Sequence, residues 1–598
     1  MFKSIIKLFR LLTPKQRNKF YKLQILIILM VLLEIVGVAS IIPFMTLVGD
    51  MTQLQNNPII VQIYQASGVS SEKFFLLILG TGVLIMLFIS AMISMLTIWR
   101  LSMFANRIGV EIANRLYSYY LKQNLLFHVN SSSAQLTKKI ATETDRLTDG
   151  VLVPIMQMNA RIILSIFMSI SIFIYDPKVA IVGLTVFAIA YFFLFKVVKV
   201  RLQNNGNAIS DVNENRYRLM NEGFGGIKDI LLFGRQNFFI KNFFQSGKIL
   251  AYSQGNNSAL ALVPRYFMEL VAFSSMISLV LYLISTYDGN LGMVLPIFSV
   301  YALATFKLLP AFQQIYVNLA TIKGNIAAYD SIQKDLEDST QSKDVKLENV
   351  KNNLLPKKNI HLEDIFFKYS NKTEATLKQI NVKIPVNSVV GIVGPSGSGK
   401  STLIDILLGL IQPDHGYLKI DETTISEKNR RSWQNTIGFV AQSIFLSEGS
   451  IAENVAFGIS PEEINFSQID RALNLANLSE FVETLKDGIH TKVGERGVQI
   501  SGGQRQRIGI ARALYHDTKV LIFDEATSSL DGITEKMIMN AIDEFSGQKT
   551  IIIIAHRLKT IRKSNIIYYI EKGQIEDHGT YEELIQKNKK FKKMSEHA

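Results

Sequence analysis

The chain has 598 residues, enough for several domains, and it has no cysteine, which excludes disulfides and thiolate metal sites. Apolar residues make up 48% of it, and its mean hydropathy of +0.20 is high for a soluble protein. The net charge of +14 lies entirely in residues 1–330, which hold 29 Lys or Arg and 15 Asp or Glu, while the rest holds 35 of each. Because this positive charge flanks long apolar runs, it favours a membrane partner over nucleic acid.

The first 22 residues are basic and contain no acidic residue. Their charged side chains are Lys3, Lys7, Arg10, Lys15, Arg17, Lys19 and Lys22. The apolar run that follows is too long for the core of a signal peptide, and no small-residue cleavage site comes after it. We therefore expect residues 1–22 to be an uncleaved cytosolic arm.

Six apolar segments follow the arm, each long enough to cross a bilayer or nearly so. They are roughly residues 23–48, 74–99, 151–175, 179–195, 262–286 and 291–309. Leaving out Lys307 at a helix end, the four segments on one side hold 7, 7, 9 and 1 Lys or Arg up to residue 330, and the other side holds only Lys73 and Lys178. Since basic loops stay in the cytosol, the sequence predicts a six-helix transmembrane domain over 23–330 with both termini inside.

The polar segments around this domain have their own patterns. Residues 99–150 and 196–258 are helical in pattern and are interrupted at Leu125–Ser133 and Gly225–Gly234, which predicts long helices joined by short crossing pieces. On the outer side, Pro58–Tyr64 is amphipathic and could lie on the membrane or be a plain loop. Residues 331–358 are polar and predict a linker, and from 359 to 598 strands alternate with helices, which indicates an α/β domain.

One stretch of the α/β domain fits the phosphate-binding pattern G-x-x-x-x-G-K-[ST]. It consists of Gly394, Pro395, Ser396, Gly397, Ser398, Gly399, Lys400, Ser401 and Thr402. The apolar run Val389–Val393 before it predicts a buried strand, and the residues after it have helical spacing. In this context backbone N–H groups wrap the phosphates, Lys400 reaches the β- and γ-phosphates, and Ser401 binds Mg²⁺.

Further motifs stand around the phosphate loop in a fixed order. They are Tyr369, Gln442 after the strand Ile437–Val440, Gly494–Gly497, the run Ile500-Ser501-Gly502-Gly503-Gln504, Asp524 and Glu525 after the strand Val520–Asp524, Ser529-Leu530-Asp531, and His556 after the strand Ile551–Ala555. Together with the loop they span roughly 190 residues. In this order they resemble the nucleotide-binding domain of ATP-binding-cassette transporters, with Ile500 where leucine is usual.

The resemblance implies roles for these residues. Tyr369 would stack on the adenine of ATP, while Ser401, Gln442 and Asp524 would hold Mg²⁺, the last two through water. The catalytic residues would be Glu525, which positions the attacking water, His556, which contacts the γ-phosphate, and Gln442. In this family the signature residues Ser501 to Gln504 complete the ATP site of a second domain, so a chain with one loop and one signature would act as a homodimer.

Charged residues inside the apolar segments point to the cargo, because such residues are costly in a membrane. Arg265 and Glu269 lie one helical turn apart in the fifth segment, Lys307 ends the sixth, and Glu34 lies in the first. A cavity lined by Arg265 and Lys307 would suit an anionic headgroup such as a diphosphate. The alternative is structural: Arg265 pairs with Glu269, and Lys307 extends to the interface.

Several of these features also resemble the Pgl-type flippases of lipid-linked oligosaccharides. They are Val263-Pro264-Arg265-Tyr266 with Glu269, Lys307-Leu308-Leu309-Pro310, Glu34 and Pro43. The chain departs from that family in its uncharged second segment, where Ser90 stands in place of an arginine. The resemblance implies a flippase of the bacterial inner membrane that moves an undecaprenyl-diphosphate-linked glycan for protein glycosylation or surface polysaccharide.

Other functions share the ATPase motifs and stay open. A lipid or multidrug exporter would prefer an apolar cavity, and an ATP-gated channel or regulator would tend to lack Glu525. An exporter with an N-terminal peptidase domain is disfavoured because residues 1–22 are too short and cysteine is missing. The six apolar segments exclude a soluble cassette protein that acts on nucleic acid.

Overall fold

The computed structural model describes the chain except for residues 1, 11, 50–61, 63, 66, 70, 176, 287–290, 342–352, 495, 496, 498, 526–531, 533, 534, 537, 538, 541–543, 556, 597 and 598. It divides into two compact units. The helical unit comprises Met1–Gln123 and Phe127–Asp344, and the α/β unit comprises Asn124–Leu126 and Val345–Ala598. The amphipathic stretch predicted at Pro58–Tyr64 lies largely outside the described residues.

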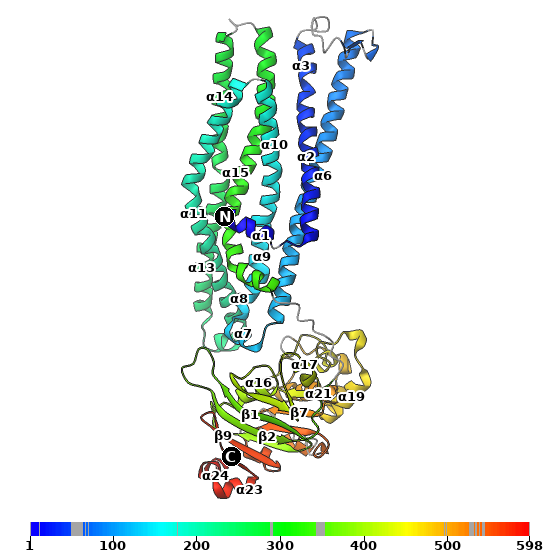
Figure 1. The fold of residues 1–598 in the computed structure, drawn as a ribbon, viewed down its shortest axis with the longest axis vertical. Helices are drawn as coiled ribbons and strands as arrows, with labels where there is room; N and C mark the ends of the chain where they lie inside the picture. Colours follow the sequence, from blue (N-terminus) through cyan, green and yellow to red (C-terminus); the bar gives the residue numbers. More distant parts are fainter. Residues whose placement is uncertain are drawn as a thin grey trace. The chain divides into compact units, whose positions relative to one another are not determined.

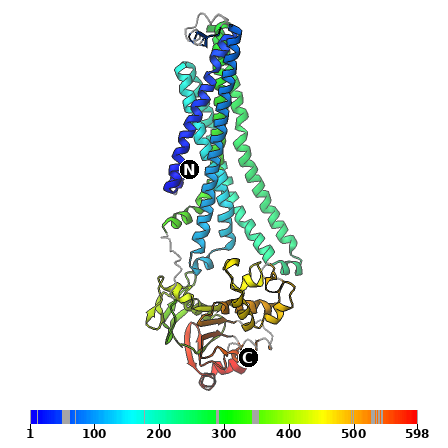
Figure 2. The same cartoon turned by 90° about the vertical axis from the view of Figure 1, so that its right-hand side faces the viewer.

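Long helices make up the helical unit (Figure 1). They are α1 (Phe2–Arg10), α2 (Pro14–Ala39), α3 (Ile41–Gly49), α6 (Glu72–Leu121), α8 (Ser133–Lys138), α9 (Thr144–Leu147), α10 (Val153–Tyr175), α11 (Pro177–Gly225), α12 (Ile227–Leu232), α13 (Gln236–Leu262), α14 (Pro264–Thr286) and α15 (Leu291–Gln341). Two π-helical turns, η1 (Lys139–Glu143) and η2 (Thr148–Leu152), join α8, α9 and α10. Helix α2 packs on α6, and α11 lies beside α13 and α15 (Figures 1 and 2).

Among the described residues, four helical stretches are long and apolar enough to cross a membrane: Pro14–Met45, Glu72–Leu121, Ser133–Ile174 and Gln236–Tyr282. They overlap the first, second, third and fifth predicted segments, and only the second of these lies wholly inside one of them. The bounds of these segments as membrane spans stay predictions. The fourth and sixth predicted segments lie within α11 and α15 and stay predictions as spans.

Three helices run far beyond their apolar segments, and the sequence predicts this for α6 and α11 but not for α15. Helix α6 has 50 residues, α11 has 49 and α15 has 51. Short helices stand where the crossing pieces were expected, at α7 (Leu125–Asn130) and α12. Since polar residues follow the apolar ones in each long helix, these extensions carry the bundle past the hydrocarbon region.

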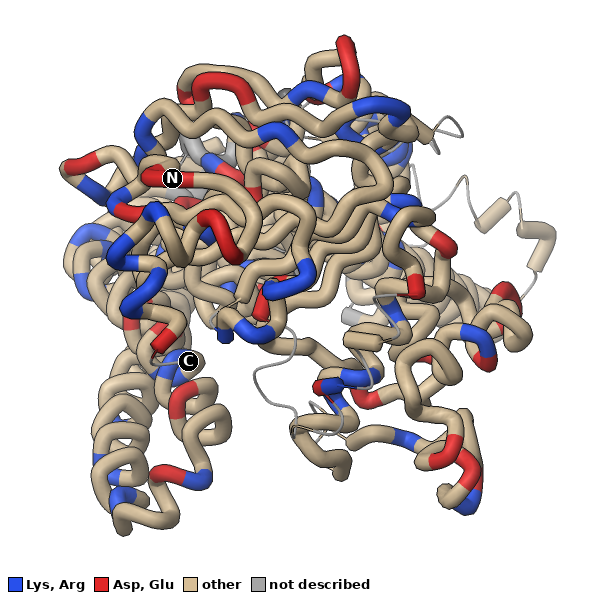
Figure 3. Tube along the Cα trace, turned by 90° about the horizontal axis from the view of Figure 1, so that it is seen from below, with Lys and Arg blue, Asp and Glu red and all other residues tan. Residues whose placement is uncertain are grey.

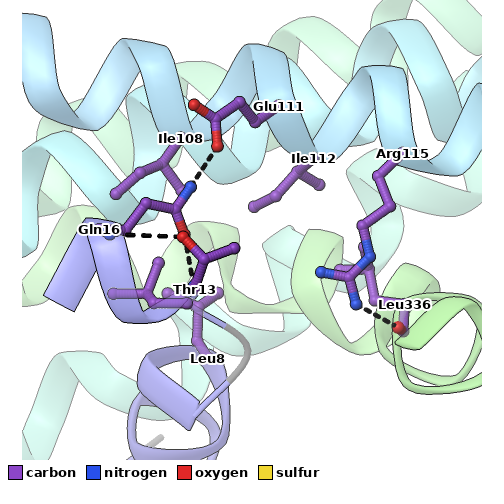
Figure 4. Close-up of a pocket in the computed structure, with 9 residues that line it drawn as sticks. Leu8, Thr13, Gln16, Ile108, Glu111, Ile112, Arg115 and Leu336 are labelled. Carbon is purple, nitrogen blue, oxygen red and sulfur yellow. Dashed lines mark hydrogen bonds between the residues drawn. The ribbon is translucent and has the colours of Figure 1, made fainter. Parts of the chain in front are cut away.

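The N-terminal arm is more ordered than the sequence suggests. Thr13 caps α2 through a reciprocal capping box with Gln16, so this helix begins inside the predicted arm. Leu8 and Leu12 are buried. In the pocket of Figure 4 Gln16 donates to the Glu111 carboxylate, and Arg115 of α6 donates to a backbone carbonyl of α15. These contacts fasten the arm to the bundle.

Two predicted boundaries differ from the structure. The first predicted segment, 23–48, is broken at Ser40 between α2 and α3, because Pro43 lacks the N–H that would bond to the carbonyl of residue 39. The linker predicted from residue 331 starts too early, since α15 continues to Gln341. Ile332 and Leu336 are fully buried at helical spacing, and Lys334 between them is exposed, as expected for an amphipathic helix.

The α/β unit contains two sheets. One has six strands in the order β10 (Gln574–Gly579), β9 (Ile566–Glu571), β3 (Val389–Val393), β8 (Thr550–Ile554), β7 (Val520–Asp524) and β6 (Ile437–Val440). The other has four antiparallel strands in the order β2 (Leu377–Pro385), β1 (Asn359–Phe367), β4 (His415–Ile420) and β5 (Thr423–Thr424). All residues of β3 and β8 are buried, as befits central parallel strands with both faces covered.

Helices complete the α/β unit. They are α16 (Lys400–Leu407), α17 (Arg430–Gln434), α18 (Ile451–Val455), α19 (Phe466–Leu475), α20 (Ser479–Glu483), α21 (Gly502–Tyr515), α23 (Tyr581–Lys587) and α24 (Lys589–Glu596). Acidic and basic residues intermingle over the surface seen in Figure 3. This mixture matches the balanced charge of residues 331–598.

Candidate ATP site

The phosphate loop connects β3 to α16 as the sequence predicts, and its glycines are needed for its path. Gly397 and Gly399 have φ angles of 77° and 106°, which L side chains rarely adopt. A Cβ on Gly394 would lie 2.0 Å from the carbonyl oxygen of Ile570. The loop therefore passes close to β9 and leads into the N-terminus of α16, where backbone N–H groups favour a phosphate.

Lys400 is a buried cation in this loop. The residue is only 6% exposed, and its Nζ donates to the carbonyl oxygens of Gly394 and Pro395 at 2.8 and 3.0 Å. Burial lowers the pKa of Lys400, while the nearby Glu525 and Asp524 carboxylates act in the opposite sense.

The loop also contains an unsatisfied donor. The Ser398 Oγ is buried and has no hydrogen-bond partner among the described residues. A buried hydroxyl of this kind is rare unless something else binds it. Together with Lys400 and the open space at Gly397, it makes the loop a good fit for a nucleotide phosphate.

The acidic edge of the site lies at the end of β7. Glu525 follows Asp524 with a φ of 49°, an unfavourable angle for glutamate, and its N–H donates to the carbonyl of Ile554 on β8. Gln442, just after β6, donates from Nε2 to Glu525 Oε2 at 2.5 Å. The structure thus brings together two of the predicted catalytic residues, in a strained backbone of the kind that clusters at active sites.

Asp405 belongs to this edge and was missed in the sequence. It lies on α16, one turn after Ser401, in a run that is otherwise apolar. Burial, with the Asp524 carboxylate as a second cause, raises the pKa of Asp405 to about 6. Its isolation in the apolar run Leu403–Leu408 was the available signal.

Tyr369 lies beside the phosphate loop. Its hydroxyl is 3.2 Å from Thr402 Oγ1, and its ring meets Phe367 edge-on at 4.9 Å between centroids. The ammonium of Lys372 lies 5.5 Å from the ring centroid. The structure thus places the aromatic ring beside the phosphate loop, and its stacking on adenine stays a prediction.

The signature residues begin a helix. Ser501 caps α21, since its Oγ accepts from Gln504 N at 3.2 Å and its N–H donates to Gln504 Oε1 at 2.8 Å. Gly502 and Gly503 form the first helical turn, where N–H groups have no partner inside the helix. Of the remaining motifs, Glu495, Arg496, Ser529, Leu530, Asp531 and His556 lie outside the described residues.

The four charged residues proposed to bind cargo occur in two pairs. Arg265 Nε lies 2.6 Å from Glu269 Oε1, and Lys307 Nζ lies 3.7 Å from Glu34 Oε2. The Ser94 hydroxyl donates to Glu34 Oε1 at 2.9 Å. The pairing of Arg265 with Glu269 is the structural alternative that the sequence left open. The pairing of Lys307 with Glu34 was not predicted.

Comparisons with known proteins agree with this architecture. Residues 25–249 match the family model of the ABC transporter transmembrane region, and residues 377–528 match that of the ABC transporter. A solved bacterial Atm1-family ABC exporter with ATP bound has the same fold, with a TM-score of 0.79 at 20% identity over 96% of this chain and 99% of that one. The chain is an ABC exporter half-transporter. Its α/β unit is the ATPase that drives transport.

Curated relatives of this half-transporter cover most of its length. The ATP-dependent lipid A-core flippase of Cupriavidus pinatubonensis is 29% identical over 82% of both chains, and that of Escherichia coli K12 is 28% identical over 81% of this chain and 82% of its own. The heterocyst differentiation ATP-binding protein HepA of Nostoc is 29% identical over 81% of this chain and 78% of its own. The chain is thus similar to lipid A-core flippases as well as to other ABC proteins.

Proposed function

We propose that two copies of this chain form an ATP-driven flippase in a bacterial inner membrane, with all termini in the cytoplasm. The cargo is a polyprenyl-diphosphate-linked oligosaccharide, which moves from the cytoplasmic to the periplasmic leaflet. The observation that carries this cargo class is the presence of two cations, Arg265 on α14 and Lys307 on α15, in the predicted fifth and sixth apolar segments. The flippases among the relatives support a lipid cargo.

ATP hydrolysis follows from the groups around the phosphate loop. Lys400 binds the β- and γ-phosphates, and Glu525 orients the attacking water and accepts its proton. Mg²⁺, held by Ser401 and through water by Asp524 and Gln442, would neutralise charge on the phosphate oxygens. Because Gln442 contacts the Glu525 carboxylate directly, it also fixes the direction of that side chain. His556 is the further residue proposed to contact the γ-phosphate.

A homodimer follows from the signature residues acting on a second copy. The chain has one phosphate loop and one signature, so two complete ATP sites need two chains. Large apolar side chains around α12 are also exposed, including Phe224 at 77%, Leu232 at 77% and Phe233 at 67%. An apolar patch of this kind usually marks an interaction site, and a second copy would cover it.

The membrane cations are suited to exchange of anions. Lys307 is 3.7 Å from Glu34, a long ion pair, and its side chain is 37% exposed. A headgroup phosphate that displaced Glu34 from Lys307 would leave Glu34 with its hydrogen bond from Ser94, so the carboxylate would not lose every partner. Arg265, whose side chain is 60% exposed, would offer a second, bidentate contact.

The proposal is tested by flipping of a polyprenyl-diphosphate glycan in reconstituted vesicles. We expect Lys307→Ala to abolish flipping and to leave basal ATPase activity in place. The charge-balanced variant Lys307→Ala/Glu34→Ala should also fail to flip, because the phosphate loses its cation whether or not Glu34 is present. Phe306→Ala changes the neighbouring, 76% exposed residue and serves as control. Flipping restored in the balanced variant would show that the pair is only structural.

A lipid exporter without a glycan requirement is the second candidate, and the lipid A-core flippases among the relatives favour it. Vesicles that contain lipid A-core in place of the polyprenyl-diphosphate glycan distinguish the two cargoes. A third class, an ATP-gated channel or regulator, is disfavoured because Glu525 is present and touches Gln442.

A further inference from the structure

The helix from Ser133 to Ile174 contains a buried group of charges at its π-helical turns. Glu143 lies in η1 with its side chain fully buried, and the side chains of Lys138 and Arg146 are 6% and 12% exposed. We call these three residues, with Ser210 and Glu214 of α11, the π-turn cluster. Buried charges destabilise a fold unless they are paired, so their contacts decide what the cluster does.

Arg146 joins three parts of the bundle. Its Nη1 lies 3.1 Å from Glu143 Oε2 and donates to Ser210 Oγ at 2.7 Å. Its Nη2 donates to the carbonyl of Gly206 on α11 at 3.3 Å, and its Nε donates to Asn325 Oδ1 on α15 at 3.4 Å. One guanidinium therefore holds α9, α11 and α15 together.

Lys138 completes the charge balance of the cluster. Its Nζ lies 3.0 Å from Glu214 Oε2 and 3.7 Å from Glu143 Oε1, and it donates to the carbonyl of Ser210 at 3.2 Å. Two cations thus face two carboxylates. Removing Glu143 would leave Arg146, whose side chain is only 12% exposed, without a carboxylate partner among the described residues.

Glycines bring the same helices into backbone contact beside the cluster. A Cβ on Gly206 would lie 2.3 Å from the carbonyl oxygen of Gly324, and one on Gly150 would lie 2.5 Å from Asn325 Cγ. A Cβ on Gly109 of α6 would lie 1.9 Å from Thr148 Oγ1 in η2. Interfaces this close repack between discrete arrangements and do not deform gradually.

Two π turns, η1 and η2, interrupt the α-helical geometry at the cluster. Each π turn accommodates one more residue than an α-helical turn, so η1 and η2 together rotate α10 relative to α8. Such turns occur frequently at functional sites. Apolar residues would stabilise the packing as well as buried charges do, so stability alone does not account for the charges. The charges therefore select one arrangement of the helices.

We propose that the π-turn cluster couples ATP hydrolysis to transport by holding the extensions α8–α10, α11 and α15 as one rigid body. Glu143 and Arg146 are positioning residues in this proposal, since they touch neither ATP nor cargo. The proposal rests on the proposed flippase function for its transport measurement. Its second measurement does not depend on the cargo.

The decisive variant is Glu143→Gln/Arg146→Gln, which removes one charge of each sign. Because the remaining pair Lys138–Glu214 is still balanced, we expect the thermal unfolding midpoint to stay near that of the wild type. ATPase activity should stay within about twofold, while glycan-lipid flipped per ATP should fall about tenfold, the usual size of coupling between sites. Glu143→Gln alone should unfold earlier, because Arg146 loses its carboxylate.

The matched control is Arg218→Gln/Glu222→Gln on the same α11. This pair is also formed by one Arg and one Glu, at 3.9 Å, but its side chains are 65% and 55% exposed. We expect this control to change neither the amount of glycan-lipid flipped per ATP nor the thermal unfolding midpoint. Wild-type flipping per ATP in the cluster variant would overturn the proposal, and so would a parallel fall in ATPase activity and flipping.

The second measurement uses spin labels in the cysteine-free chain. A nitroxide on Phe74→Cys, an exposed residue near the start of α6, reports the distance between two protomers by pulsed electron paramagnetic resonance. Trapping with ATP and vanadate should change this distance in the wild type and the control, and leave it unchanged in the cluster variant. A normal change in the variant would overturn the proposal. If the distance changed normally in the wild type but the wild type did not flip the polyprenyl-diphosphate glycan, the proposed cargo would be contradicted instead.

Discussion

Buried cations have different partners in the two units of this protein. In the α/β unit, Lys400 donates to two backbone carbonyls and, among the described residues, to no carboxylate. In the helical unit, the buried Lys138 and Arg146 and the partly exposed Lys307 each have a carboxylate within 4 Å. Lys400 therefore has no bound carboxylate that a phosphate would need to displace, whereas these three cations would bind a new anion only by exchange.

The two units also differ in how their backbones are constrained. Around the ATP site the unusual angles are local, at Gly397, Gly399 and Glu525. In the bundle the special features are π turns and glycine contacts that involve several helices at once. The unusual backbone of the α/β unit is therefore confined to single residues, whereas that of the helical unit is shared by several helices.

The largest effect should come from Glu525, the residue proposed to act as general base. Glu525→Gln would remove the proposed proton acceptor but keep the shape of the side chain and leave Lys400 in place. We expect ATP to bind with nearly unchanged affinity and hydrolysis to fall by about 10² to 10⁴-fold, the usual contribution of a general base. Phosphate release and equilibrium nucleotide binding measure the two quantities.

Glu427→Gln is the control, because this glutamate lies exposed in the same unit. Its hydrolysis rate should equal that of the wild type. If Glu525→Gln hydrolysed ATP at a rate close to the wild type, Glu525 would have no catalytic role, and its strained backbone would need another explanation.

The next effect tests whether a complete site needs two chains. Lys400→Ala should lose nucleotide binding, and Ser501→Arg should block the N-terminus of α21, so each variant alone is expected to be inactive. In a mixed dimer, one composite site carries both changes and the other carries none. Co-expression should therefore restore occlusion of about one nucleotide per mixed dimer.

The control for the mixed dimer is each variant expressed alone, in which both chains of the dimer carry the same change. Recovery confined to the mixed preparation would support a site shared between chains. If mixing restored nothing while both chains were folded and copurified, the signature would act within its own chain.

The sequence was most informative where function depends on consecutive residues. Strands β3, β6 and β7 were predicted to the residue, because apolar runs and motif residues set both of their ends. The contact between Gln442 and Glu525 was not predicted, since it joins two loops 83 residues apart. A motif gives the residue types of a site, and the geometry requires the parallel pairing of β6 with β7.

In the helical unit, prediction failed where tertiary contacts decide. The composition indicated apolar spans, but nothing local shows that Lys307 pairs with Glu34, 273 positions away. The π-turn cluster was missed for the same reason, since nothing in the sequence near Lys138, Glu143 and Arg146 shows that these charges are buried. Their burial depends on Ser210 of α11 and Asn325 of α15.

The smallest expected effect concerns Asp405, whose environment combines features of both units. Asp405 is half-buried and, like Lys400, has no ion-pair partner among the described residues. Burial, with the Asp524 carboxylate as a second cause, raises its pKa from 3.8 to about 6. A raised carboxyl pKa means that the folded state holds its proton more tightly than the unfolded state does. The protein therefore loses stability as pH rises from about 4 through about 6, and it keeps this penalty at pH 7.5.

Replacing Asp405 with Asn removes the charge that burial penalises. In nucleotide-free protein with a chelator present, we expect Asp405→Asn to raise the thermal midpoint at pH 7.5 by roughly 2–4 °C, and to raise it less at pH 5. Asp470→Asn, on the exposed face of α19, is the control and should change neither midpoint. A gain at pH 5 equal to that at pH 7.5 would mean that side-chain packing, and not the charge of Asp405, sets the difference between the two proteins.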